Sequence, residues 1–84
     1  MRKNNEEEKK KNEFLSECPR ITMLGSTQLF VENFKAIIIC EEQNIKLSTV
    51  PFMLNISGNN LIVRSITTDI IEIGGEILGI HLEK

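Results

Sequence analysis

The sequence predicts a single small all-β domain, an antiparallel meander of seven or eight short strands that follows a charged N-terminal tail. Three observations lead to this fold class. Aliphatic and β-branched residues alternate with polar ones between Ile45 and Leu82, which is the period of a half-buried strand. Small polar or glycine-containing breaks interrupt the apolar runs at short intervals. Thirteen of the 84 residues are isoleucine, which favours strands over helices.

The first segment, residues 1–18, is the predicted tail. Residues 1–13 carry five basic and four acidic side chains, for a net charge of +1. Glu6 precedes Lys10, and Glu7 precedes Lys11, by the four residues that support a helical ion pair. A helix and a segment that is disordered until a partner binds both remain open. We expect the segment to end at Cys18, because a residue before proline is pushed out of helical conformation.

The predicted domain covers residues 19–84, and its first half contains four expected strands. The breaks between them are Gly25-Ser26, Asn33 to Lys35, and Glu42 to Asn44, which are polar or glycine-containing. The expected strands are Ile21–Leu24, Gln28–Glu32, Ala36–Glu41 and Ile45–Thr49.

The second half of the domain is expected to contain two hairpins. Pro51 fits a turn or a strand start, where its missing N–H costs no ladder hydrogen bond. Gly58-Asn59 is expected to turn the first hairpin and Gly74-Gly75 the second. The strands are then Phe52–Ser57, Asn60–Ile66, Asp69–Ile73 and Glu76–Leu82. The breaks leave no room for a crossover helix, so neighbouring strands should be antiparallel. A compact sheet, a small sandwich, a partly closed barrel and a solenoid-like roll all fit this pattern.

Two of the expected strands are apolar on both faces. Ile37, Ile38 and Ile39 are consecutive, which suits a central strand covered on two sides. In the last strand, Ile77 falls on one face while Leu78, Ile80 and Leu82 fall on the other. One face can close the core of the domain, and the second needs the tail or another subunit to cover it. We therefore expect a partner surface.

The residues that could carry chemistry are isolated from one another along the chain. His81 is the only histidine, and no spacing fixes an acid, thiol or hydroxyl beside it. Glu41-Glu42 and the pair Glu72 and Glu76 lie outside any calcium-loop pattern and are expected to be solvated. We therefore predict no catalytic, cofactor-binding or metal-ligating residues, no cofactor and no enzymatic activity. An enzyme that uses Glu41 or Glu42 with His81 is the weaker hypothesis, and it requires those side chains to converge.

Charge and hydropathy exclude further classes of protein. Residues 14–84 have a net charge of −3, which disfavours a nucleic-acid surface. The longest apolar stretch, Ala36–Cys40, is far shorter than the roughly 20 residues of a membrane helix. The charged N-terminus does not resemble a signal peptide. Cys18 and Cys40 are too few for a disulfide framework or a zinc site, and we expect thiols in a reducing compartment with Cys40 buried.

The order of these short motifs resembles the YabP/YqfC family of sporulation proteins, and most of all its YqfC branch. The resemblance begins with residues 19–25, PRITMLG, and residues 28–33, QLFVEN. It continues through residues 45–49, IKLST, and through the spaced apolar and glycine residues of 54–63 and 71–80. The family pattern places a glycine shortly after the Ser-Thr pair, where this chain has Val50-Pro51-Phe52.

The resemblance implies a small protein made in the mother cell of an endospore-forming bacterium. It implies action beside a membrane-bound sporulation protein during formation of the spore envelope, in the cytoplasm or peripherally at the forespore outer membrane. Self-association into a homo-oligomer is the other expected interaction, with no nucleic acid and no membrane span of its own. The matching positions Gly25, Ser48, Thr49, Gly58 and Gly75 read equally well as structural requirements. A small-molecule or glycan-binding β module, with a sizeable lined pocket, is the alternative function.

Overall fold

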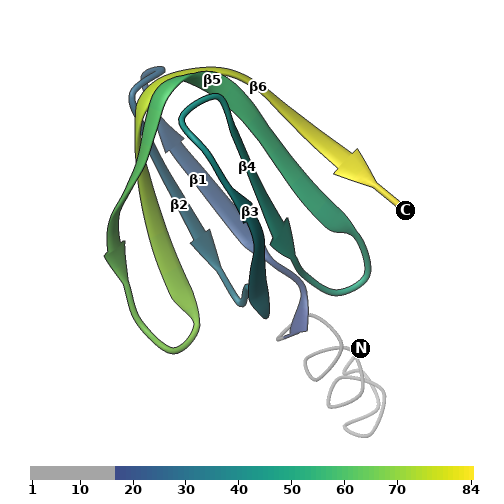
Figure 1. The fold of residues 1–84 in the computed structure, drawn as a ribbon. Helices are drawn as coiled ribbons and strands as arrows, with labels where there is room; N and C mark the ends of the chain where they lie inside the picture. The colour runs from purple at the N-terminus through teal and green to yellow at the C-terminus, as the bar shows by residue number, and fades with distance from the viewer. Residues whose placement is uncertain (1–16) are drawn as a thin grey trace, which may run out of the picture.

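A computed structural model describes residues 17–84 and contains one sheet of six antiparallel strands (Figure 1). The prediction of an all-β fold with antiparallel neighbours is confirmed, and the predicted count of seven or eight strands is wrong. The predicted structure of residues 1–16 of the tail lies outside the described residues. The strands are β1 (Arg20–Leu24), β2 (Gln28–Glu32), β3 (Ala36–Cys40), β4 (Asn44–Ser48), β5 (Met53–Ile66) and β6 (Ile70–Glu83).

The strand order corrects the predicted meander. The sheet runs β1-β2-β6-β5-β4-β3, so β2 pairs with the last strand and not with β3. Leu29 lies opposite Ile73, and Val31 lies opposite Ile71. Meanwhile β4 pairs with the first half of β5, where Ile45 lies opposite Ile56. Two hairpins, β1-β2 and β3-β4, therefore flank the long β5-β6 hairpin on its two sides.

The two predicted hairpin turns, at Gly58 and at Gly74-Gly75, are bends within long strands. They lie across from each other in the β5-β6 pair, whose register shifts between Asn59 and Ile62. Gly75 has a φ of 111° and Asn60 a φ of 55°, values that few L-residues adopt. An alanine at Gly58 would overlap the backbone carbonyl of Glu76. These bulges bend the hairpin instead of ending its strands, which is why four expected strands become two.

The bend brings the two ends of the sheet face to face. In Figure 1 the ribbons of β5 and β6 arch over the top, with β1 and β2 behind β3 and β4. One half-sheet contains β1, β2, the start of β6 and the end of β5. The other contains β3, β4, the start of β5 and the end of β6.

The core is built from the inward side chains of both half-sheets. Buried and half-buried side chains alternate along β4 as the sequence predicts: Ile45 and Leu47 are buried, and Lys46 between them is half-buried. Burying these aliphatic side chains supplies the main stabilising free energy, about 1.5–3 kcal/mol for each one. The buried apolar residues are Leu29, Val31, Phe34, Ile45, Leu47, Leu54, Ile56, Leu61, Ile71, Ile73 and Ile77.

The turns of the two flanking hairpins hold the bend in place. In the β1-β2 turn, the carbonyl of Ser26 accepts a hydrogen bond of 2.8 Å from the N–H of Ile77. In the β3-β4 turn, the carbonyl of Gln43 accepts from Gly58 at 3.2 Å and that of Glu42 from Leu61 at 2.7 Å. Each turn therefore occupies backbone groups that a bend would otherwise leave unpaired.

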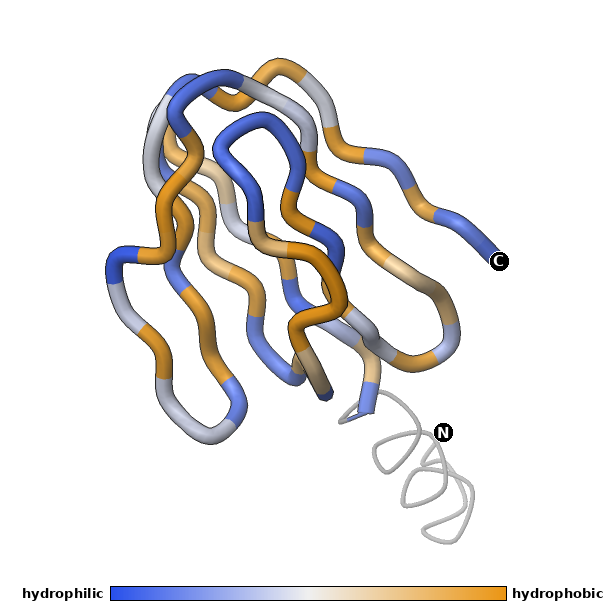
Figure 2. Tube along the Cα trace, in the orientation of Figure 1, coloured by the Kyte–Doolittle hydropathy of each residue, from blue (hydrophilic) through white to orange (hydrophobic). Residues whose placement is uncertain are grey.

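Two predictions about the β3 segment are wrong. This strand is at the edge of the sheet, not in its centre, and Ile37 and Ile38 are exposed. Cys40 is exposed as well, although free cysteine is usually buried. The isoleucine run, visible as a continuous apolar stretch in Figure 2, indicated two covered faces, but a bulge between Ile37 and Ile39 interrupts the alternation at an uncovered edge.

Candidate interaction surfaces

A polar ladder crosses the outer face of β4, β5 and β6. Lys46 lies opposite Asn55, which in turn lies opposite His81. The Nζ of Lys46 is 3.1 Å from Oε1 of Glu83, and the amide of Asn55 donates a 3.0 Å hydrogen bond to Oε2 of the same carboxylate. The Asn44 amide donates to Oδ1 of Asn55 and, at 3.2 Å, to the carbonyl of Ile56. The ladder ties three strands together across their solvent face.

The partners of Glu83 act on its ionisation. The hydrogen bond from Asn55 and then the bond from Lys46 lower the pKa of the Glu83 carboxyl below its usual value. Hydrogen bonds to a carboxylate favour the charged form, and a neighbouring ammonium does the same. Glu83 is therefore held as an anion that faces the sheet.

The second surface is the free edge of β6. Strand β2 pairs with β6 only as far as Gly74, whereas β5 accompanies β6 to Glu83. One edge of the C-terminal half of β6 therefore has no neighbouring strand within the described residues. Figure 1 shows this half as the yellow ribbon that leads to the C-terminus, with β5 on one side and no ribbon on the other.

Three large side chains along this edge are apolar. Ile80 lies opposite buried Ile56, and Leu82 lies opposite buried Leu54, so both point to the inner face of the sheet. They are nevertheless 36% and 51% exposed, because the facing half-sheet does not cover this part of β6. Leu78 is unpaired in the register shift between Ser57 and Gly58, and it is 66% exposed.

Exposed apolar residues are as numerous as buried ones among the described residues. Eleven large apolar side chains are exposed by 36% or more, and eleven apolar residues form the core. The exposed set gathers on β1, on β3, on the second half of β5 and at both ends of β6: Ile21, Met23, Leu24, Ile37, Ile38, Ile62, Ile66, Ile70, Leu78, Ile80 and Leu82. Such a distribution is typical of a surface that another molecule covers.

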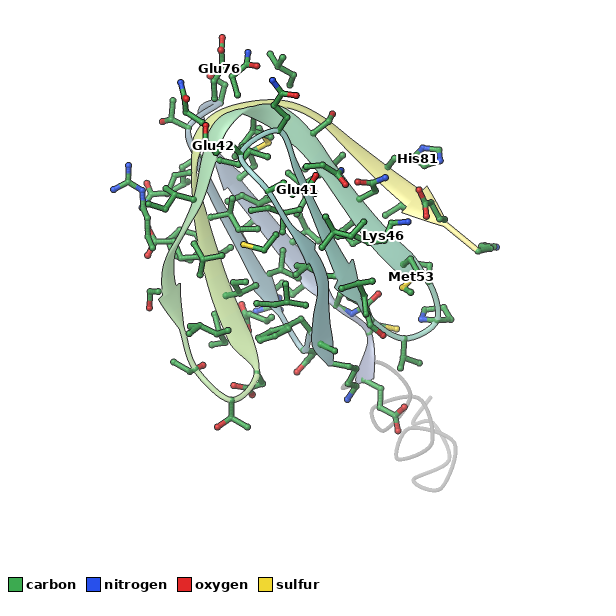
Figure 3. The ribbon with its side chains drawn as sticks, viewed as in Figure 1. Glu41, Glu42, Lys46, Met53, Glu76 and His81 are labelled. Atoms are coloured by element: carbon green, nitrogen blue, oxygen red, sulfur yellow. The ribbon has the colours of Figure 1, made fainter. Side chains whose placement is uncertain are left out.

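The structure does not place Glu41 or Glu42 beside His81. Glu41 and Glu42 follow β3, whereas His81 is on β6, and Figure 3 shows their side chains apart. Strands β4 and β5 lie between β3 and this part of β6, a separation of about 14 Å at the usual strand spacing. Glu72 instead accepts a 3.1 Å hydrogen bond from Gln28, and Glu76 accepts one of 3.0 Å from Asn59. The hypothesis that Glu41 or Glu42 acts with His81 is therefore wrong.

The described part of the chain offers a shallow depression and no cluster of metal-ligating side chains. No group of three or more His, Cys, Asp or Glu side chains in residues 17–84 could hold a metal ion. The bend of β5 and the β3-β4 turn border an open depression of about 370 Å³, lined by Glu42, Asn60, Leu61 and Ile62. A helix long and apolar enough to cross a membrane is not found in these residues.

Comparison with known proteins places the chain in a family. The family model described as "YabP family" matches residues 17–84, which is most of the chain. The chain belongs to the YabP family. A YabP-family relative, "Uncharacterized protein YqfC" of Bacillus subtilis (strain 168), is 29% identical over 63 residues, covering 75% of this chain and 68% of that protein. The predicted resemblance is thus confirmed. No solved structure matches this chain.

The positions that carry the YabP-family resemblance have structural roles in this fold. Gly25 turns β1 into β2 with a φ of 61°, and Gly58 and Gly75 form the bend of the long hairpin. Ser48 ends β4 and accepts a 2.7 Å backbone hydrogen bond from Lys35. The buried hydroxyl of Thr49 donates to the carbonyl of Phe52 in the next turn. The sequence reading missed the free β6 edge, since strand order alone reveals which apolar residues stay uncovered.

Proposed function

We propose that this chain is a non-enzymatic interaction protein of the sporulating mother cell. It binds a membrane-bound partner, a second copy of itself, or both, and so acts as a scaffold module while the spore envelope is built. It works from the cytoplasm, peripherally at the forespore outer membrane. Membership of the YabP family and the resemblance to its sporulation proteins support the cellular setting.

The observation that supports a role in binding is the set of strand edges that no other described strand covers. Within residues 17–84, β1, β3 and half of β6 each present large apolar side chains and an unpaired edge. An unpaired apolar edge is a template for another strand or another apolar surface. The polar ladder around Lys46 and Glu83 keeps the opposite face of the sheet hydrated, so binding is directed to the edges.

Gene deletion in the organism that encodes this chain tests the proposal. We expect spores with a defective envelope by electron microscopy, and a fluorescent fusion that collects around the forespore. Complementation with Met23→Lys or Ile38→Lys, each on an exposed strand edge, identifies the edge that the partner needs. Thr22→Lys, on the outer face of β1, is the matched control and should complement fully. Normal spores after deletion, together with a diffuse fusion protein, would contradict the proposed function.

A further inference from the structure

The C-terminal half of β6 is a distinctive docking surface because its edge and its inner face are both uncovered. The strand has β5 on one side only from Leu78 onward. Leu78 has the largest exposed fraction among the large apolar residues of the described chain. Ile80 and Leu82 extend the inner apolar face of the sheet beyond the facing strands. Another strand added here would continue both the hydrogen-bond ladder and the apolar face.

We propose that two copies of the chain pair antiparallel along this edge, about a two-fold axis at Ile80. The inference rests on the proposed function as an interaction protein and names one partner, the chain itself. An isologous contact sets residue i opposite residue j and j opposite i. With the axis at Ile80, that residue faces its own copy, Leu78 faces Leu82, and Glu76 approaches Lys84. Apolar side chains thus meet apolar ones at Leu78, Ile80 and Leu82, and opposite charges meet at both ends. The same register sets Gly79 opposite His81 and Ile77 opposite Glu83.

The edge carries one bulge, at Leu78, and beyond it Gly79 to Glu83 pair with β5 in unbroken register. Soluble proteins guard edge strands with charged side chains, proline or bulges. The carboxylate of Glu83 is turned back to Lys46 and Asn55, 3.1 and 3.0 Å away. By contrast, Pro19 directly precedes β1, and a bulge between Ile37 and Ile39 interrupts β3 in its middle. The second half of β5, which β4 does not accompany, has two register shifts, between Asn59 and Ile62 and between Val63 and Ser65. The β6 edge is therefore the one best suited to a second copy.

The resulting dimer joins β3, β4, β5 and β6 of each copy into one continuous sheet. The two inner faces become one apolar surface, so Ile80 and Leu82 of both copies gain apolar neighbours across the junction. Pairing over five residues buries less area than a permanent interface does. We therefore expect a dimer that dissociates on dilution.

Light scattering coupled to size-exclusion chromatography of the full chain, over a dilution series, tests the pairing. Wild type should pass from dimer to monomer. Leu78→Lys and Leu82→Glu should each raise the dissociation constant at least about tenfold, since each places a charge against leucine. An equimolar mixture of the two variants should restore dimers, because the new lysine then faces the new glutamate. Ile38→Lys, on the opposite edge and 49% exposed, should leave the constant unchanged.

Circular dichroism verifies the fold of each variant, and the substituted side chains are 66% and 51% exposed. A monomer at every concentration overturns the pairing, as does a dimer broken by Ile38→Lys and not by Leu78→Lys. A mixture that stays monomeric means that Leu78 does not face Leu82, which also overturns it. If the fusion protein still collects at the forespore while the chain is monomeric, self-pairing fails and the proposed function stands. If the chain forms the dimer but deletion causes no envelope defect, the self-pairing stands and the proposed function fails.

Discussion

Replacing Gly58 with alanine tests whether the bend of the β5-β6 hairpin depends on a missing side chain. The new Cβ would overlap the carbonyl oxygen of Glu76, and it would lie 3.1 Å from the carbonyl carbon and 2.9 Å from Cδ2 of Leu61. Since a backbone carbonyl cannot rotate away, β6 itself must shift. Overpacking of this kind costs about 1–3 kcal/mol in the free energy of unfolding. In a domain of this size, that loss lowers Tm by roughly 5–20 °C.

Gly79→Ala is the matched control, because it also adds one methyl group to a glycine in the same hairpin. Its Cβ would lie 3.0 Å from Oγ of Ser57, a side chain that can rotate. Lower entropy of the unfolded chain stabilises an alanine by about 0.4–1 kcal/mol, so the control should stay within about 1 kcal/mol of wild type. Urea unfolding followed by circular dichroism at one protein concentration measures both variants. Equal stability of the two variants would refute the steric explanation of the bend.

Three further perturbations address the core, the backbone and the polar ladder. Ile71→Ala removes a fully buried side chain and should cost about 2–5 kcal/mol by urea unfolding; a loss below about 1 kcal/mol would mean that the half-sheets do not enclose it. Asn60→Gly should preserve or raise stability, whereas Asn60→Val should lower it by about 1–2 kcal/mol, because φ is 55° there; equal melting temperatures would contradict this. Asn55→Ala should raise the pKa of Glu83 toward its usual value in an NMR titration. Because the folded pKa is depressed, the stability that Glu83 contributes is present above the unfolded pKa and lost as pH falls through the folded pKa; an unchanged pKa in Asn55→Ala would exclude this hydrogen bond as the cause.

Local patterns predicted much of this fold. Alternation identified the buried side of β4, where Ile45 and Leu47 are inside, because a two-residue period requires only the strand itself. The same logic located Leu54 and Ile56 in β5. The all-β class followed because no stretch of the domain offered the period of a helix.

The remaining errors come from information that is not local. A glycine pair between two apolar runs has the same sequence whether it turns the chain or bends it, so the pattern at Gly74-Gly75 predicts a turn where the structure has a bend. The position of the isoleucine run at an edge depends on β2 pairing with β6, which lies about 40 residues away along the chain. The free edge of β6 follows from that same pairing. No periodicity within Leu78–Leu82 distinguishes a covered strand from an uncovered one.

The pairing of β2 with β6 also governs when this protein can fold during synthesis. Leu29 and Val31 leave the ribosome well before their partners Ile73 and Ile71, which are made later along the chain. A nascent chain that stops at Ile66 has β3, β4 and β5 in order and no strand to hold β1 and β2. The sheet can therefore close only after β6 has left the ribosome, and the apolar strands made earlier must avoid aggregation until then.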